Sequence, residues 1–329
     1  MAELKRIELE LYVYEGILYD NKPSEPQYKI NKKRIETHPN ITIEIGELVR
    51  DYLEASFNDD YISFTKWVEV SVFYFDEADQ PFTYSNPQIT SYLAVNGYGY
   101  FEDGANPELE RHALISSNNI YLPENTSGKI PIFKEDVGKV IIDSVTTEII
   151  DNGNTNQKIQ YLTIPANSSI IQVYATDDST LKKTINVTNI CEPKYTPYKL
   201  TFINKFGAFQ DLYMFKKSAE KLEIKSDLFK RNTIANSTAA YTTSEGQRER
   251  YNVNGSSSIT VNTGFVKEDM NQTIEQLFLS ENVWIRYNNK TLPILPKTQS
   301  LEYKTVLNDK LINYTIDFDF AFDKINNVR

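Results

Sequence analysis

The chain has 329 residues, of which 40% are hydrophobic and 24% charged, a composition typical of two or three folded domains and not of a disordered protein. Its formal net charge of −10 argues against non-specific binding to DNA or to an anionic membrane, because both need a basic surface. The 22 tyrosines and 17 phenylalanines favour β-sheets, in which aromatic side chains pack well.

The first part of the chain, residues 1–125, is predicted to be a β-rich domain with one helix. Alternation of apolar and polar residues predicts strands at residues 3–15, 26–35, 41–45, 67–75 and 89–101. Over residues 45–57 the apolar residues instead recur at helical spacing, which predicts an amphipathic helix.

Residues 126–192 are predicted to be a small β-sandwich inserted between two larger units. Turns rich in Asp, Asn, Gly and Pro recur there at intervals of roughly 10–12 residues, as they do in small sandwiches. The strands expected between these turns are at residues 140–150, 158–164, 170–175 and 181–187. Pro193 and Pro197 mark the exit from this unit.

Residues 193–329 begin with two aromatic-rich runs around Gly207, which predict a β-hairpin. Glycine suits the turn because it adopts positive φ without a Cβ clash. Large apolar residues occur at both alternating positions of the two runs, so we expect both faces of this hairpin to be buried.

The remainder of this C-terminal unit combines an irregular segment, a helix and further strands. Residues 218–240 are charged and then small and polar, with weak periodicity, and are predicted to be a long arm that orders against a partner. Apolar spacing predicts a second amphipathic helix at 266–280. Asn288 and Asn289 predict a type I′ hairpin turn. Strands are expected at 301–305 and 311–322. The fold class is therefore mainly β, with β-sandwich domains and two flanking amphipathic helices.

Few residues of this chain suit catalysis or metal binding. His38, His112 and Cys191 are the only histidines and cysteine, which is too few for a zinc site or a nucleophilic triad. There is no glycine-rich phosphate-binding loop. We therefore predict no catalytic, cofactor-binding or metal-binding residues, and we expect the protein not to be an enzyme. Cys191 is expected to be a small half-buried apolar residue.

Carboxylates are the abundant reactive groups, and two sets have a spacing worth testing. Asp317 and Asp319 would share one face of a strand, but a solvated strand face is the favoured interpretation. Asp76 and Asp79 follow a strand and predict a turn, because the further oxygen ligands of a calcium site are missing. Arg248 and Arg250 form a small basic cluster, but Glu249 between them makes it a weak candidate for binding nucleic acid.

Neither a secretory signal nor an apolar run of membrane-spanning length is visible in the sequence. We therefore expect the chain to be made in the cytoplasm of its host and not to enter a membrane.

Two stretches of the C-terminal unit resemble a known group of proteins. The run LTFINKFGAFQDLYMF, which begins at Leu200, is similar to a segment common in structural proteins of tailed bacteriophages that infect Bacteroidota. The ending, with LSENVWI from Leu279 and LEYKTVLNDKLINYTIDFDFAFDKIN from Leu301, resembles the same group. The resemblance covers about residues 198–216 and 266–329 and does not extend to residues 1–190.

This resemblance implies a virion protein of the tail or neck, as in crAss-like phages, with a tail-tube-like β-sandwich in its C-terminal part. It implies a homo-oligomeric ring that contacts other tail or neck proteins and lets phage DNA pass without sequence-specific binding. It carries no catalytic residues and no cofactor. An acidic wall suits this role because DNA does not adhere to it.

Two other functions are left open by the sequence. The abundant tyrosines are compatible with a carbohydrate-binding protein of a phage tail, for receptor recognition or adhesion, although most of them lie in strand patterns that suggest core packing. A glycan-degrading enzyme would need a pair of carboxylates in a cleft, one of them with a raised pKa.

Overall fold

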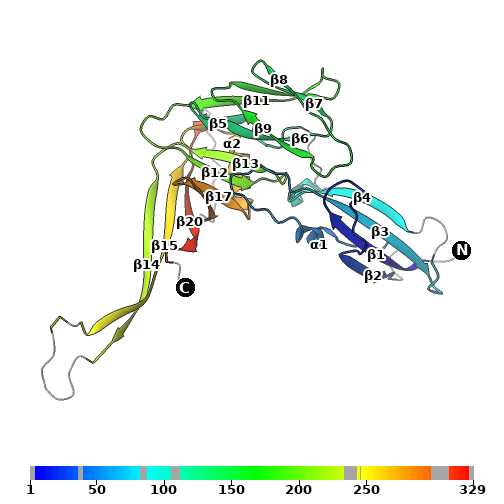
Figure 1. Cartoon of the computed structure of the whole chain (residues 1–329), viewed down its shortest axis with the longest axis horizontal. Helices are drawn as coiled ribbons and strands as arrows, with labels where there is room; N and C mark the ends of the chain where they lie inside the picture. The colour runs from blue at the N-terminus through cyan, green and yellow to red at the C-terminus, as the bar shows by residue number, and fades with distance from the viewer. Residues whose placement is uncertain are drawn as a thin grey trace.

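The computed structural model describes residues 4–35, 40–81, 87–104, 112–232, 243–244, 246–297 and 311–325. The protein is mainly β, as predicted, and its strands form several sheets. Figure 1 shows a four-stranded sheet near the N-terminus, a strand-rich middle region that lies against a larger C-terminal sheet, and a long two-stranded ribbon that projects from that sheet.

The N-terminal sheet is antiparallel, with the order β2-β1-β3-β4. Its strands are β1 (Leu4–Tyr14), β2 (Tyr28–Lys33), β3 (Lys66–Asp76) and β4 (Gln88–Ala94). One face carries the aliphatic side chains of the alternating pattern and packs against Val49 and Leu53. Tyr12, Tyr14 and Trp67 are buried on the other face, so part of the sheet is covered on both sides. The predicted strands β1 and β3 are confirmed.

The helix predicted at 45–57 is wrong in length, since α1 covers only Gly46–Arg50. The Asn96 side-chain amide donates a hydrogen bond to the Leu53 carbonyl oxygen, at 3.2 Å. In a continued helix, this oxygen would accept from a backbone N–H four residues later. Phe57 is buried, but among rings of the C-terminal sheet and not beside Val49. Tertiary packing therefore overrides the helical period, because one helical turn is marginal by itself.

The middle region contains two groups of strands. Its five-stranded sheet has the order β5-β11-β10-β7-β8, in which β5 and β11 are parallel, and β6 pairs with β9 separately. The strands are β5 (Asn119–Pro123), β6 (Gly128–Phe133), β7 (Val137–Ile142), β8 (Val145–Glu148), β9 (Ile159–Ile164), β10 (Ile170–Ala175) and β11 (Leu181–Ile190). Asp143, Asn167 and Asp178 have positive φ at the turns, a conformation that Asp and Asn tolerate better than most residues.

The C-terminal sheet has seven strands in the order β13-β12-β17-β18-β20-β15-β14. They are β12 (Tyr198–Ile203), β13 (Phe209–Met214), β14 (Ala219–Lys230), β15 (Arg248–Asn262), β17 (Val283–Tyr287), β18 (Lys290–Pro296) and β20 (Thr315–Asp323). The β12–β13 hairpin is confirmed: Gly207 has a φ of 72°, and both faces are largely buried. Asn288 and Asn289 both have positive φ in the β17–β18 turn, as a type I′ turn requires.

The helix predicted at 266–280 begins later than expected, because α2 spans Met270–Leu279. Val266 and Lys267 form the short strand β16, which pairs with β19 (Leu311–Ile312). Their backbone hydrogen bonds are thus used between strands, and Val266 is buried in that arrangement. The strand predicted at 301–305 lies outside the described residues.

One core joins the middle region to the C-terminal sheet. It includes Ile130 and Ile171 from the middle strands and Leu200, Ile274 and Phe318 from the C-terminal sheet and α2, each fully or almost fully buried. Burial of each such side chain stabilises the folded state by about 1.5–3 kcal/mol. Residues on both sides of residue 192 therefore pack on a single core.

The arm predicted at 218–240 is more regular than expected. Residues 219–230 form β14, which pairs antiparallel with β15 of the same chain, and its contact with a partner stays a prediction. The periodicity is weak because almost every β14 side chain is exposed, so neither face needs to be apolar. Residues 233–240 of that segment lie outside the described residues.

Candidate functional site

The histidines and the cysteine were the residues examined for nucleophilic or metal chemistry. His112 lies beside the carbonyl oxygen of Ala113, with its Nδ1 atom 2.8 Å away, and His38 is outside the described residues. Cys191 is exposed and not half-buried as predicted, because it lies just beyond the end of β11. A hydrogen bond and the negative charge of Glu124 raise the pKa of its thiol. Within the described ranges, no group of three or more metal-ligating side chains occurs.

The two examined carboxylate sets have local partners. Asp317 and Asp319 lie on β20, where Asp317 accepts a hydrogen bond from Thr260 and Asp319 lies 3.4 Å from the Lys297 ammonium. Asp317 is exposed and Asp319 only partly buried, as a solvated strand face requires. Asp76 accepts hydrogen bonds from two backbone N–H groups of the turn that follows it, at 2.9 and 2.8 Å, which confirms a turn.

A buried carboxylate that sequence analysis did not single out is Asp211 on β13. Burial raises its pKa, against the opposing effect of the nearby Lys199. Its two oxygens accept hydrogen bonds from Thr201, at 2.7 Å, and from the Tyr61 hydroxyl, at 2.6 Å. Lys199 also binds the second carboxylate of this network, Asp59, at 2.6 Å. Since both oxygens of Asp211 are used inside the chain, the network holds the segment around Tyr61 against the sheet.

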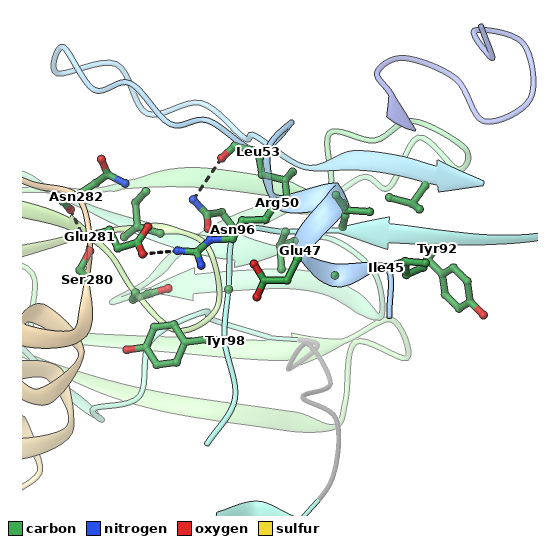
Figure 2. Close-up of a pocket in the computed structure, with 18 of the residues that line it drawn as sticks. Ile45, Glu47, Arg50, Leu53, Tyr92, Asn96, Tyr98, Ser280, Glu281 and Asn282 are labelled. Atoms are coloured by element: carbon green, nitrogen blue, oxygen red, sulfur yellow. Dashed lines mark hydrogen bonds and ion pairs between the residues drawn. The ribbon is translucent and has the colours of Figure 1, made fainter. Parts of the chain in front are cut away.

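A cleft lies between α1, the end of β4 and the residues that follow α2. Its cavity has a volume of about 580 Å³. Apolar side chains line part of it: Ile45, Val49, Leu53, Val68, Ala94 and Ile203. Figure 2 shows α1 on one side and the segment Ser280–Asn282 on the other, with the loop that carries Asn96 and Tyr98 between them. Three separate parts of the chain therefore build this cleft.

Carboxylates dominate the charge around this cavity. Glu44, Glu47 and Glu281 line it, and an adjoining hollow adds Asp51 and Glu54. Arg50, the single cation among the described residues that line the cleft, forms an ion pair with Glu281, and this pair bridges the cleft in Figure 2. We call the cavity and the hollow together the acidic cleft. One guanidinium leaves most of these carboxylates uncompensated, so the cleft attracts cations.

The Tyr98 ring also lines the acidic cleft, on the side of α2 in Figure 2. Its hydroxyl oxygen is buried and lacks a hydrogen-bond partner within the described ranges. Burial raises the pKa of Tyr98, so this hydroxyl keeps its proton and remains a hydrogen-bond donor.

The second candidate site is the outer ribbon, which we define as residues 226–231 and 247–254. β20 pairs with β15 only between Ser256 and Asn262, so the outer ribbon has no third strand beside it. At about 3.3 Å per residue, its seven β15 residues 248–254 extend roughly 23 Å beyond that pairing. Figure 1 shows the ribbon extending away from the rest of the molecule. Both of its edges therefore offer unpaired backbone groups.

Large apolar side chains are exposed on this ribbon. Leu228 is 60% exposed, Phe229 43% and Tyr251 51%, and the two aromatic rings contact each other at 5.7 Å. Nearer the sheet, Leu222 and Ile224 are also exposed. Several exposed apolar residues on a projecting element are typical of an interaction surface.

No protein-family model, curated protein or solved structure matches this chain. The resemblance of residues 198–216 and 266–329 to phage structural proteins therefore stays a prediction. No α-helix within the described ranges is long and apolar enough to cross a membrane.

Sequence reasoning placed one strand of the outer ribbon in the predicted arm at 218–240 but missed the acidic cleft. The length of that segment was the signal, because alternation is weak where almost every β14 side chain is exposed. Four carboxylates of the acidic cleft lie close together in the sequence, at residues 44–54, but the cleft forms only when the fold brings them beside Asn96, Tyr98 and Glu281.

Proposed function

We propose that the chain is a structural component of a bacteriophage virion that forms an oligomeric ring in the tail or neck, at the head–tail connection. The observation that carries the proposal is the outer ribbon, which has two open strand edges and exposed apolar side chains. Such an element is suited to adding strands to, or lying on, a neighbouring subunit. A repeated contact of this kind between non-identical surfaces closes into a ring when its rotation permits.

Two further features support this proposal. The C-terminal sheet and α2 would form the tail-tube-like β-sandwich module that the sequence resemblance implies. The net charge of −10 suits a ring through which phage DNA passes, because like charges do not adhere. Other tail or neck proteins would contact the ring, and the protein would reside in the virion after synthesis in the host cytoplasm.

The ribbon can be shortened without disturbing the sheet. Lys225 pairs with Asn254, so an Asn-Gly dipeptide in place of residues 226–253 would join them through a two-residue type I′ turn. We expect this variant to stay folded, as judged by circular dichroism and thermal denaturation, and to lose self-association. Light scattering at increasing protein concentration measures that loss. Unchanged oligomers in the shortened variant would refute the role of the ribbon.

A second candidate function is sugar binding in receptor recognition or adhesion. The observation that favours it is Tyr92, whose ring is 54% exposed at the edge of the acidic cleft, near the carboxylates Glu44 and Glu47. An exposed aromatic ring beside carboxylates offers both stacking and hydrogen bonds to a sugar. Binding of the wild-type protein to a glycan array, and its loss in Tyr92→Ala, would support this function. An array without signal would reject it.

A further inference from the structure

We propose that the outer ribbon of one copy docks in the acidic cleft of a second copy of this chain. The inference rests on the self-assembly proposed above, and it names the surface that receives the ribbon. It follows from the charge of one ribbon face, from the lining of the cleft and from the direction in which the ribbon extends.

One face of the outer ribbon is basic and carries a single apolar side chain. Leu228 lies directly opposite Arg250, and Lys230 lies opposite Arg248. Directly opposite residues of an antiparallel pair share a face, as do residues two apart on one strand. Leu228 and three cations therefore form one face, and we call it the basic face.

The acidic side chains of the outer ribbon lie on its other face. Asp227 pairs with Tyr251, and Phe229 pairs with Glu249, so these four side chains share the opposite face. The ribbon is thus polarised: three cations lie on one side, whereas the other side carries the aromatic pair and both carboxylates, with Arg231 paired to Glu249 at 3.6 Å. A partner of the basic face would need negative charge around a small apolar surface.

The acidic cleft has this composition. Its apolar lining would receive Leu228, which is 60% exposed in the single chain, and its carboxylates would meet the cations. Glu47 and Glu54 are exposed, so their charges are available to a partner. A cleft of this size, with an apolar lining and a few polar groups, is typical of a binding site.

The ribbon that fills this cleft must come from another molecule. Figure 1 shows the ribbon and α1, which borders the cleft, directed to different sides of the C-terminal sheet. The contact therefore joins two different surfaces of identical chains. Each copy in a dimer still has either its ribbon or its cleft available to a further copy. Such a head-to-tail contact propagates into a closed ring or a filament. For a chain with a net charge of −10, a basic face against an acidic cleft also overcomes the repulsion between copies.

The first test variant reverses the charges of the basic face, as K230E/R248E/R250E. The cleft of this variant is intact, and we expect its self-association to weaken by at least about tenfold, because like charges then face each other across the contact. A matched control with the same change in net charge reverses three exposed lysines elsewhere: Lys33, Lys217 and Lys290. This control should associate nearly as the wild type does.

The second variant reverses the cleft, as E47K/E54K. It leaves Glu44 in place because that carboxylate accepts a hydrogen bond from the Gly46 N–H, at 2.9 Å. It should lose self-association to a similar extent, with the same measurement by analytical ultracentrifugation. Its matched control reverses two exposed carboxylates remote from the cleft, Glu25 and Glu148.

The decisive experiment mixes the two variants in equal amounts. Each native ribbon then meets a native cleft and each reversed ribbon meets a reversed cleft, so we expect assembly to return in the mixture although neither variant assembles alone. Restoration also shows that both variants are folded. A cleft variant that assembles as well as the wild type, while the ribbon variant does not, would overturn this docking but leave the proposed function in place. A wild-type protein that stays monomeric at every concentration would overturn both.

Discussion

Phe57→Ala tests whether the segment after α1 is held by aromatic packing against the C-terminal sheet. Phe57 is 7% exposed, and its ring lies 4.7 Å from that of Phe209, 5.2 Å from that of Tyr61 and 5.5 Å from that of Trp284. Transfer of a buried phenylalanine side chain to water costs about 1.5–3 kcal/mol. The lost ring contacts and the remaining cavity raise the expected loss in the free energy of unfolding to about 3–5 kcal/mol.

Urea denaturation of both proteins measures this loss, followed by tryptophan fluorescence and by circular dichroism. Trp284 is a local reporter because it contacts Phe57 directly. The matched control is Phe101→Ala, since the Phe101 side chain is fully exposed and its removal should change the free energy of unfolding by less than about 0.5 kcal/mol. A Phe57→Ala effect no larger than that of the control would refute the packing argument.

Three further substitutions test the hairpin and the buried carboxylate. Gly207→Ala should lower the free energy of unfolding by about 2 kcal/mol or more in urea, because Gly207 has a φ of 72° and a methyl group there would lie 2.9 Å from the Asn96 nitrogen. Asn204→Ala should cost about 2–4 kcal/mol in the same assay, because its buried amide donates to the Leu114 carbonyl, at 2.7 Å, and that oxygen would lose its partner. Asp211→Asn should change the pH dependence of stability. Burial raises the folded-state pKa of Asp211 above 3.8, so the wild type should lose stability relative to the variant as pH rises through that folded-state pKa. Thermal denaturation of both proteins between about pH 3.5 and pH 7 measures the difference, and parallel curves would contradict it.

The sequence predicts best those elements whose side chains are buried on a regular pattern. The β12–β13 hairpin and the strands β1 and β3 follow from period-two patterns rich in aromatic and β-branched residues, which buried sheet faces favour. The Asn288–Asn289 turn follows from local conformational preference alone. In these elements, local and tertiary requirements agree.

The predictions that failed concern segments in which tertiary contacts compete with the local pattern. Residues 45–57 carry a helical period, but Phe57 is buried among the aromatic rings of the C-terminal sheet, and Asn96 takes the carbonyl of Leu53. In the opposite case, β14 has almost no buried side chain, so burial imposed no pattern on residues 218–230. The acidic run at residues 44–54 is visible in the sequence, but the cleft is not, because its shape exists only after the fold brings this run beside the residues that follow α2.

The stability of the chain and the proposed association through the outer ribbon depend on different residues. The middle region and the C-terminal sheet are stabilised by their common core, and no residue of the outer ribbon belongs to that core. A two-stranded ribbon without a third strand is marginal by itself, and an exposed leucine such as Leu228 contributes little to the stability of a single chain. The charges at Lys230, Arg248 and Arg250 oppose indiscriminate pairing of its edges and still permit contact with an acidic surface. Ribbon variants should therefore change association before they change stability, whereas Phe57→Ala should do the reverse.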